Sequence, residues 1–202
     1  MPQIDCYITL LSPYVYLAGP RFAQIVTRHA AKVRFMPLHF GSLAARMGST
    51  LMADASEARR DWYAQDLARQ AKKQGLQINT RPLYWPTNPA PASYAVIAAQ
   101  AAVDKGATGD LAGWVHGFGA AVWAQERNIA DDDEVRRLLV THGFEENTAD
   151  RGMLTAAETY AGNLESAASR GVFGVPFYIV DDQKFWGQDR LDDLDHYLAG
   201  KS

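Results

Sequence analysis

Residues 171–191 read GVFGVPFYIVDDQKFWGQDRL, and the rest of the chain is organised around them. Residues 177–180 are apolar and rich in aromatic and β-branched side chains, so they predict a buried strand that turns at Asp181-Asp182. Residues 184–186 predict a second short strand, which ends before the polar start of a last helix. The stretch therefore predicts a β-β-α unit.

A proline, Pro176, opens this buried strand, where it removes one hydrogen-bond donor from the sheet. In one interpretation the Val175-Pro176 bond is cis, which would turn the backbone N–H and C=O of Val175 away from the sheet toward a ligand. In the other it is an ordinary trans bond at the first residue of a strand. This stretch alone favours the trans form.

The N-terminal residues 1–40 predict a β-α-β unit. Residues 4–11 (IDCYITLL) are rich in β-formers and predict a buried strand. Ser12 and Pro13 are the pair expected at the N-cap and first position of a helix that extends to about residue 30. Residues 33–38 alternate in polarity and predict a second strand, which a right-handed crossover places parallel to the first.

Helical patterns replace strand patterns between residues 41 and 169. Apolar positions at helical spacing and a glycine stop predict a helix over 56–74, and a loop with several prolines follows at 76–90. Further helices are expected at 92–105, 109–127, 131–142 and 148–169. The predicted fold class is therefore α/β: a thioredoxin-like domain in two segments, 1–40 and 170–202, with a large α-helical insertion domain at 41–169, as in DsbA-like proteins.

Composition excludes several classes of function. The chain of 202 residues is 48% hydrophobic, and its net charge of -3 provides no basic surface for nucleic acid or an anionic membrane. The single cysteine, Cys6, cannot form an internal disulfide, and the five histidines are dispersed without ligand spacing, so no metal site is expected. We find no leader-like or membrane-spanning stretch and expect a cytoplasmic protein whose partner is a small molecule or a protein.

Three segments carry a resemblance to a known family: LSPYVYLA at 11–18, AVWAQERNIAD at 121–131 and RGVFGVPFYIVDDQKFWGQDRL at 170–191. In this order along the chain, they resemble the 2-hydroxychromene-2-carboxylate isomerases, relatives of the kappa-class glutathione transferases. The resemblance implies a homodimeric, cytoplasmic, glutathione-dependent isomerase of intermediates in aromatic hydrocarbon catabolism. The cofactor's thiol would add to a conjugated double bond of a small aromatic substrate. With the resemblance, we expect the Val175-Pro176 bond to be cis.

Ser12 is the candidate catalytic residue. Redox members of the fold begin this helix with a Cys-x-x-Cys pair, but here the positions are Ser12, Pro13, Tyr14 and Val15, which excludes disulfide exchange at this site. A hydroxyl at a helix N-terminus stabilises an anion, so a glutathione thiolate would be favoured there over the thiol. The alternative is that Ser12 is only a helix cap.

Further positions match those that hold glutathione in the family. The resemblance implies that the backbone at Val175-Pro176 pairs with the cysteinyl unit, while Gln188 and Asp189 hold the γ-glutamyl end and Asp189 pairs with its ammonium. Asp189 has the alternative role of a helix cap. Arg59 matches a basic residue that meets a glutathione carboxylate, or else belongs to a solvated helix face. Ser49 stands where the family more often has asparagine, which puts that contact in doubt.

Asn88, Tyr14 and Trp85 are the candidate substrate-binding residues. Asn88 lies in a loop that resembles the substrate-side segment of the family, although an asparagine in a turn is the alternative. The two aromatic side chains are candidates to line a pocket for an aryl group, or to belong to the core. Two other functions stay open from the sequence: a kappa-like glutathione transferase, which would release the conjugate, and a non-catalytic module that holds an extended peptide at Val175-Pro176.

Overall fold

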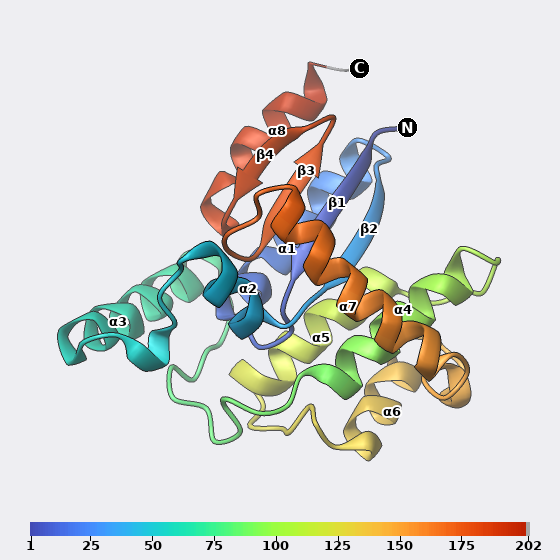
Figure 1. The fold of residues 1–202 in the computed structure, drawn as a ribbon, viewed down its shortest axis with the longest axis horizontal. Helices are drawn as coiled ribbons and strands as arrows, with labels where there is room; N and C mark the ends of the chain where they lie inside the picture. The colour runs from blue at the N-terminus through green and yellow to red at the C-terminus, as the bar shows by residue number, and fades with distance from the viewer. Residues whose placement is uncertain (201–202) are drawn as a thin grey trace.

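The computed structural model describes residues 1–200 and contains a four-stranded mixed sheet in the order β2-β1-β3-β4 (Figure 1). β1 (Gln3–Ile8) and β2 (Lys32–Pro37) are parallel. β3 (Phe177–Val180) is antiparallel to β1, and β4 (Gln183–Trp186) is antiparallel to β3. The predicted mixed sheet is confirmed. The last two residues of the predicted segment 170–202 lie outside the described residues.

Strand β1 is shorter than the sequence predicted, because it ends at Ile8 and not at Leu11. The backbone N–H of Ser12 donates to the C=O of Thr9 at 3.0 Å, which makes residues 9–12 a turn. Leu10 is buried in that turn, so its apolar character reflects burial in the core and not strand pairing.

Three helices cover the sheet. Phe22 packs its ring against Tyr178 of β3 on one face, with 4.8 Å between ring centroids, and Ser166 meets Tyr7 of β1 at 2.9 Å on the other. Figure 1 shows one of these helices, α7, crossing in front of β1 and β2, with α1 behind the sheet. The covering helices are α1 (Pro13–Arg28), α7 (Met153–Ser169) and α8 (Leu191–Ala199).

The helices other than α1 and α8 form the helical region that the sequence predicted between β2 and β3. One of them, α7, falls within the predicted insertion range and still packs on the sheet, where Asn163 donates to the C=O of Pro37 at 2.9 Å. The other elements of this region are α2 (Phe40–Met47), α3 (Glu57–Gln74), α4 (Ala90–Val103), α5 (Leu111–Trp123), α6 (Asp132–Thr141) and the short 3₁₀ turns η1 (Met52–Asp54) and η2 (Glu146–Thr148).

Gln100 on α4 joins the helical region to the exposed edge of the sheet. Its side-chain Oε1 accepts from the backbone N–H of Phe35 in β2 at 2.7 Å, and its Nε2 donates to the C=O of the same residue at 3.2 Å. The side chain therefore satisfies backbone groups of an edge strand that would otherwise be open to pairing with another chain.

Helices α1 and α5 approach closely because α5 carries a glycine at the contact. A Cβ at Gly119 would lie 2.8 Å from Cβ and 3.1 Å from Cα of Tyr16 on α1. One turn away, the ring of His116 stacks on Tyr16 with 5.1 Å between centroids. Burial, which disfavours the charged form, lowers the pKa of His116 below its ordinary value. The helical region is thus held directly against the helix that begins at Ser12.

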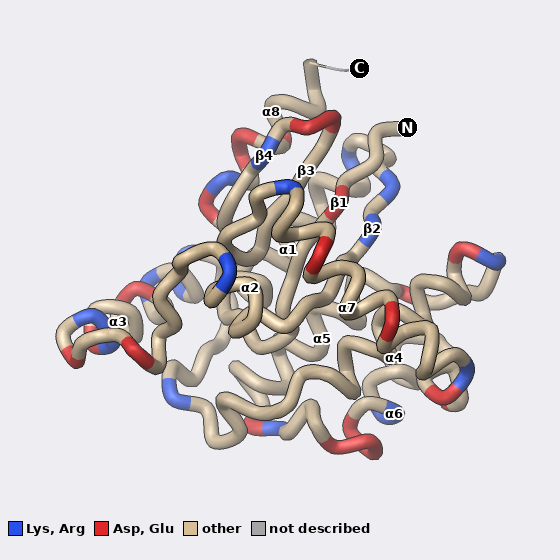
Figure 2. The backbone as a smooth tube through the Cα atoms, viewed as in Figure 1, with Lys and Arg blue, Asp and Glu red and all other residues tan. Residues whose placement is uncertain are grey.

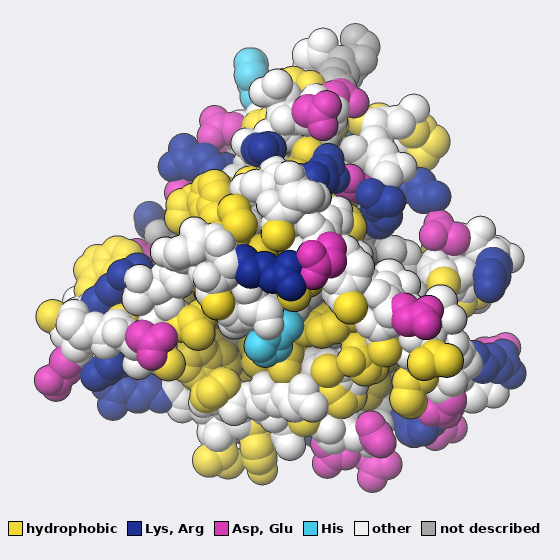
Figure 3. Space-filling model, viewed as in Figure 1, with side chains coloured by type: hydrophobic (Ala, Val, Ile, Leu, Met, Phe, Trp, Pro, Cys, Tyr) yellow, Lys and Arg dark blue, Asp and Glu magenta, His cyan; other side chains and the backbone are white. Residues whose placement is uncertain are grey.

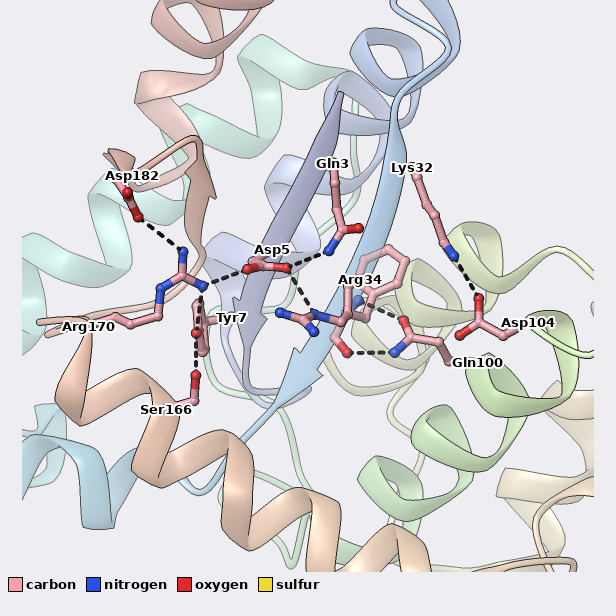
Figure 4. A network of polar contacts seen from close by, with 11 residues as sticks. Gln3, Asp5, Tyr7, Lys32, Arg34, Gln100, Asp104, Ser166, Arg170 and Asp182 are labelled. Carbon is pink, nitrogen blue, oxygen red and sulfur yellow. Dashed lines mark hydrogen bonds and ion pairs between the residues drawn. The ribbon is translucent and has the colours of Figure 1, made fainter. Parts of the chain in front are cut away.

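A buried carboxylate, Asp5, connects the strands to the end of α7 (Figure 4). It accepts from Arg34 of β2 at 2.9 Å and from Arg170 at 2.5 Å, and Arg170 also donates to the hydroxyl of Tyr7 at 3.3 Å. Burial alone would raise the pKa of Asp5, but the hydrogen bonds from Arg170 and Arg34 outweigh it and hold that pKa below its usual value.

We expect Asp5→Asn to lower the free energy of unfolding at pH 7 by about 1.5 to 3 kcal/mol, because hydrogen bonds to a charged group are lost. The folded pKa is below the model-peptide value of 3.8, so this contribution is complete above that value and is lost as the pH falls through the folded pKa. Urea unfolding at several pH values should show the difference between the two proteins shrinking below pH 3.8. The exposed Asp54→Asn is the control, and a difference that is the same at pH 3 and pH 7 would contradict the role given to Asp5.

The surface carries charges of both signs without a single basic face. Figure 2 shows acidic and basic residues interspersed along α3 and α8, and on the face in Figure 3 hydrophobic side chains gather below α2. Within residues 1–200, no helix is long and apolar enough to cross a membrane.

Candidate active site

The first turn of α1 presents the hydroxyl of Ser12. Its Oγ accepts from the backbone N–H of Val15 at 3.3 Å, and the residue is 9% exposed. No acceptor for the hydroxyl hydrogen occurs among the described residues. Because a hydroxyl has two lone pairs and one hydrogen, it can cap the helix and donate to a ligand at the same time. The predicted cap is confirmed, and it leaves the donor available.

No thiol lies in this turn. Ser12 and Val15 occupy its two ends, and the single cysteine of the chain, Cys6, is buried inside β1. Burial raises the pKa of the Cys6 thiol, so it stays protonated. Any thiolate at the N-terminus of α1 must therefore come from a bound molecule.

The loop before β3 leaves the backbone of Val175 without partners. The Val175-Pro176 bond is cis, as the resemblance predicted, and the trans form that the stretch alone favoured is wrong. The C=O of Pro176 accepts from the N–H of Gly187 at 2.9 Å, but the N–H and C=O of Val175 make no hydrogen bond within residues 1–200. A second cis bond, Trp85-Pro86, was not predicted.

Gln188 and Asp189 lie in the 3₁₀ turn η3 (Gln188–Arg190), which packs against α1. Gln188 is only 5% exposed, and its side-chain amide has no hydrogen-bond partner among the described residues. The carboxylate of Asp189 is 59% exposed and pairs with Arg190 at 2.9 Å. It caps no helix, because neither η3 nor α8 has a side-chain cap, so the capping alternative for Asp189 is wrong.

Two further predicted residues are Ser49, which follows the end of α2, and Arg59, which lies on α3. The hydroxyl of Ser49 donates to the C=O of Phe173 at 2.8 Å, which ties the end of α2 to the loop that carries Val175. Arg59 lies in the first turn of α3, where it is exposed and its guanidinium has no partner in the described part of the chain.

The predicted substrate-side residues are only partly brought together. Trp85 donates from Nε1 to the C=O of Leu11 at 3.0 Å, immediately before Ser12. The hydroxyl of Tyr14 donates to Asp66 at 3.2 Å. Asn88 is exposed and its Oδ1 accepts from the N–H of Ala90 at 3.1 Å, as an asparagine in a turn does. No contact joins Asn88 to Ser12, and its role in binding stays a prediction.

Sequence reasoning missed the part of α3 that holds Tyr14. The ring of Tyr63 meets Tyr14 edge-on at 5.6 Å, and Asp66, three residues further along α3, accepts the hydroxyl of Tyr14. Burial is the largest cause that raises the pKa of Tyr14, and the nearby Tyr63, Asp66 and Asp189 raise it further. The i, i+3 spacing of Tyr63 and Asp66 was the available signal, because such residues share one face of a helix.

Comparisons with known proteins place the chain in a family. Residues 3–199 match the profile of the DSBA-like thioredoxin domain. The chain belongs to the DSBA-like thioredoxin domain family. The 2-hydroxychromene-2-carboxylate isomerase of Pseudomonas putida is 26% identical over 193 residues, which cover 93% of this chain and 90% of that protein. That of Sphingobium xenophagum is 27% identical over 204 residues, covering 96% and 97%. The resemblance found in the sequence is confirmed.

Solved structures agree with the DSBA-like assignment. A structure of 2-hydroxychromene-2-carboxylate isomerase superposes with a TM-score of 0.80 at 22% identity, covering 98% of this chain and 94% of that one. The cytosolic disulfide reductase DsbM from Pseudomonas aeruginosa, solved with GSH, has a TM-score of 0.70 at 18% identity, with 98% of each chain covered. These likenesses confirm the thioredoxin-like fold, while the curated relatives, named as isomerases, support an enzyme.

Proposed function

We propose that this DSBA-like protein is a glutathione-dependent isomerase of 2-hydroxychromene-2-carboxylate and the related trans-o-hydroxybenzylidenepyruvate. The observation that carries the proposal is the hydroxyl of Ser12, a free donor at the N-terminus of α1 in a turn without a thiol. Two relatives named as this isomerase match the chain over nearly its whole length, which supports the reaction class.

The residues present fit glutathione at several of its groups. The unpaired backbone N–H and C=O of Val175 suit an extended peptide that adds as a short strand. The side chain of Gln188 is mostly buried and its amide has no partner among the described residues, so the amide can hydrogen-bond a polar ligand. Asp189 can hold an ammonium and Arg59 a carboxylate, because both charged groups are accessible. The hydroxyl of Ser49 already donates to the C=O of Phe173, so its proposed role is to position the loop that carries Val175.

When bound, glutathione would supply a thiolate nucleophile for reversible addition to the conjugated enone. Ser12, whose Oγ already accepts from Val15, would donate its hydroxyl hydrogen to the sulfur, and the N-terminal end of α1 would contribute a positive potential at the same place. Both effects favour the anion and lower the pKa of the thiol. The chain thereby activates a nucleophile that its own residues do not provide.

Product analysis tests this function. The protein is mixed with 2-hydroxychromene-2-carboxylate and glutathione, and chromatography follows both isomers and total glutathione. We expect interconversion that requires glutathione and leaves its amount unchanged. Accumulation of a conjugate would instead identify a kappa-like transferase. Calorimetry that shows no glutathione binding at millimolar concentration would exclude both enzymes and leave the peptide-binding module.

We expect Gln188→Leu to weaken glutathione binding about threefold to tenfold, because one hydrogen bond of ordinary strength is lost. The same change should leave the free energy of unfolding unchanged or raise it, since the amide of this mostly buried side chain makes no hydrogen bond within residues 1–200. Calorimetry and urea unfolding measure the two quantities. Gln183→Leu, at the exposed start of β4, is the matched control. An unchanged glutathione affinity in Gln188→Leu would remove Gln188 from the site.

A further inference from the structure

A groove of about 550 Å³ lies between α3 and the loop that precedes α4. Aromatic side chains of Tyr63, Trp85 and Trp123 line it, together with the guanidinium-bearing Arg60 and Arg81. The rings of Trp85 and Trp123 are packed together, with 5.6 Å between centroids. A groove of this volume, with apolar rings and a few charged groups, has the character of a binding site for a small aromatic molecule.

The wall of this groove is built from residues that touch the first turn of α1. Trp85 donates to the C=O of Leu11 at 3.0 Å, and Tyr63 packs against Tyr14 at 5.6 Å. Leu11 and Tyr14 stand on either side of Ser12 in the chain. Two residues of the groove therefore contact chain neighbours of Ser12, although neither Ser12 nor Asn88 is among its lining residues.

Arg81 is the free cation of the groove. Its guanidinium has no carboxylate or carbonyl partner in the described part of the chain, while Arg60 donates to the C=O of Ala55. Two acidic residues also line the groove, Glu57 and Asp61, and both belong to α3. Asp61 accepts from Gln65 of the same helix at 2.8 Å. Arg81 is the one charged residue among the loop residues that line the groove, which are Thr80, Arg81, Pro82 and Trp85.

The loop that carries Arg81 is held in place from both ends. Asn79 donates its backbone N–H to the C=O of Trp123 at 2.6 Å and its side-chain amide to Glu126, which also accepts from the N–H of Leu83 at 2.7 Å. The N–H of Arg81 itself donates to the side chain of Asn79 at 2.9 Å. A backbone ordered before binding lowers the entropy that a ligand must overcome to engage the side chain.

We propose that this groove binds the aromatic acid that the enzyme isomerises, and that Arg81 is the specificity residue that binds its carboxylate. The inference rests on the proposed function, since it takes from it the substrate class. A guanidinium pairs with a carboxylate through two parallel hydrogen bonds, and the half-buried rings of Trp85 and Tyr63 provide an apolar surface for the aryl group. Trp85 and Tyr63 contact Leu11 and Tyr14, so a molecule held against their rings would lie next to the segment that carries Ser12.

Binding without turnover tests the inference separately from the reaction. The probe is trans-o-hydroxybenzylidenepyruvate in the absence of glutathione, and its methyl ester is the uncharged counterpart, both titrated by calorimetry. We expect Arg81→Gln to weaken binding of the acid about tenfold to a hundredfold, as loss of a hydrogen-bonded charge does, and to leave the ester within about twofold. Arg81→Lys should lie between, because lysine keeps the charge without the two-pronged geometry.

Arg151→Gln is the matched control for the loss of one positive charge, because Arg151 is exposed and outside this groove. With glutathione added, Arg81→Gln should raise the KM for the acid by the same factor by which it weakens binding of the acid, and it should change kcat little. This pattern is expected when an interaction is equally strong in the ground state and the transition state. Equal affinity of Arg81→Gln and the wild type for the acid would overturn the inference, even in an active isomerase. If the wild-type protein binds the acid through Arg81 but does not isomerise it, the groove is a binding site for the acid and the proposed function is refuted.

Discussion

Ser12→Gly should raise the pKa of the bound glutathione thiol by about one to two units. The substitution removes a hydrogen bond to a charged sulfur, which contributes about 1.5 to 3 kcal/mol, and 1.36 kcal/mol corresponds to one pKa unit. Ultraviolet titration of thiolate absorbance in the glutathione complex measures the shift directly. At a pH below the pKa of the thiol in both complexes, the rate of isomerisation should fall about tenfold to a hundredfold, because less thiolate is present.

Glycine is the appropriate replacement because it is tolerated at the N-cap, at a cost of only a few tenths of a kcal/mol. The chain offers a matched control in Ser56, which caps α3 by accepting from the N–H of Arg59 at 3.3 Å, the distance at which Ser12 accepts from Val15. Ser56→Gly should show the same small loss of stability and an unshifted thiol. An unshifted titration in a folded Ser12→Gly protein would leave Ser12 as a helix cap alone.

Gly119→Ala should destabilise the protein, although alanine is the better helix former. The added Cβ would lie 2.8 Å from Cβ of Tyr16 and 3.1 Å from its Cα, so α1 and α5 must move apart. Overpacking of this kind costs about 1 to 3 kcal/mol, and the higher helix propensity of alanine returns roughly 1 kcal/mol. Since Tyr16 lies one turn after Ser12, we also expect lower isomerase activity.

Gly162→Ala on α7 is the matched control, because a Cβ at Gly162 meets no other atom within 4 Å. This variant should be about 1 kcal/mol more stable than the wild type. The difference between the two variants in urea unfolding isolates the overpacking cost of 1 to 3 kcal/mol. Equal stabilisation by both substitutions would show that α1 and α5 are not held at the separation found here.

The elements predicted best from the sequence are those whose cause lies within a few neighbouring residues. Ser12 and Pro13 begin α1 as predicted, since a capping hydroxyl and a proline at the first position act locally. Asp181 and Asp182 turn β3 into β4 with φ values of 44° and 66°, a conformation that the two-residue hairpin requires and that aspartate tolerates better than most residues. The error at the end of β1 arose because Leu10 is buried without being in a strand, which composition cannot show.

In the candidate site, too, local features could be predicted from the sequence and features that depend on packing could not. Local signals and the family resemblance singled out Ser12, Val175 and Asp189 as separate positions, and the resemblance favoured the cis bond at Pro176. They did not indicate that the side chain of Gln188 is mostly buried, with no partner for its amide among the described residues, because that depends on what packs around η3.

By itself, then, the sequence determined the order of the strands, the cap of α1, the absence of a thiol from its first turn and the family to which the chain belongs. Only the tertiary structure decided that Trp85 meets Leu11 and that Arg81 faces the resulting groove without a partner in the described residues. These contacts join residues that are distant in the chain. Their geometry follows from how α3, α5 and the intervening loop pack together. That packing is the sum of many weak contacts between distant residues, which no short stretch of sequence specifies.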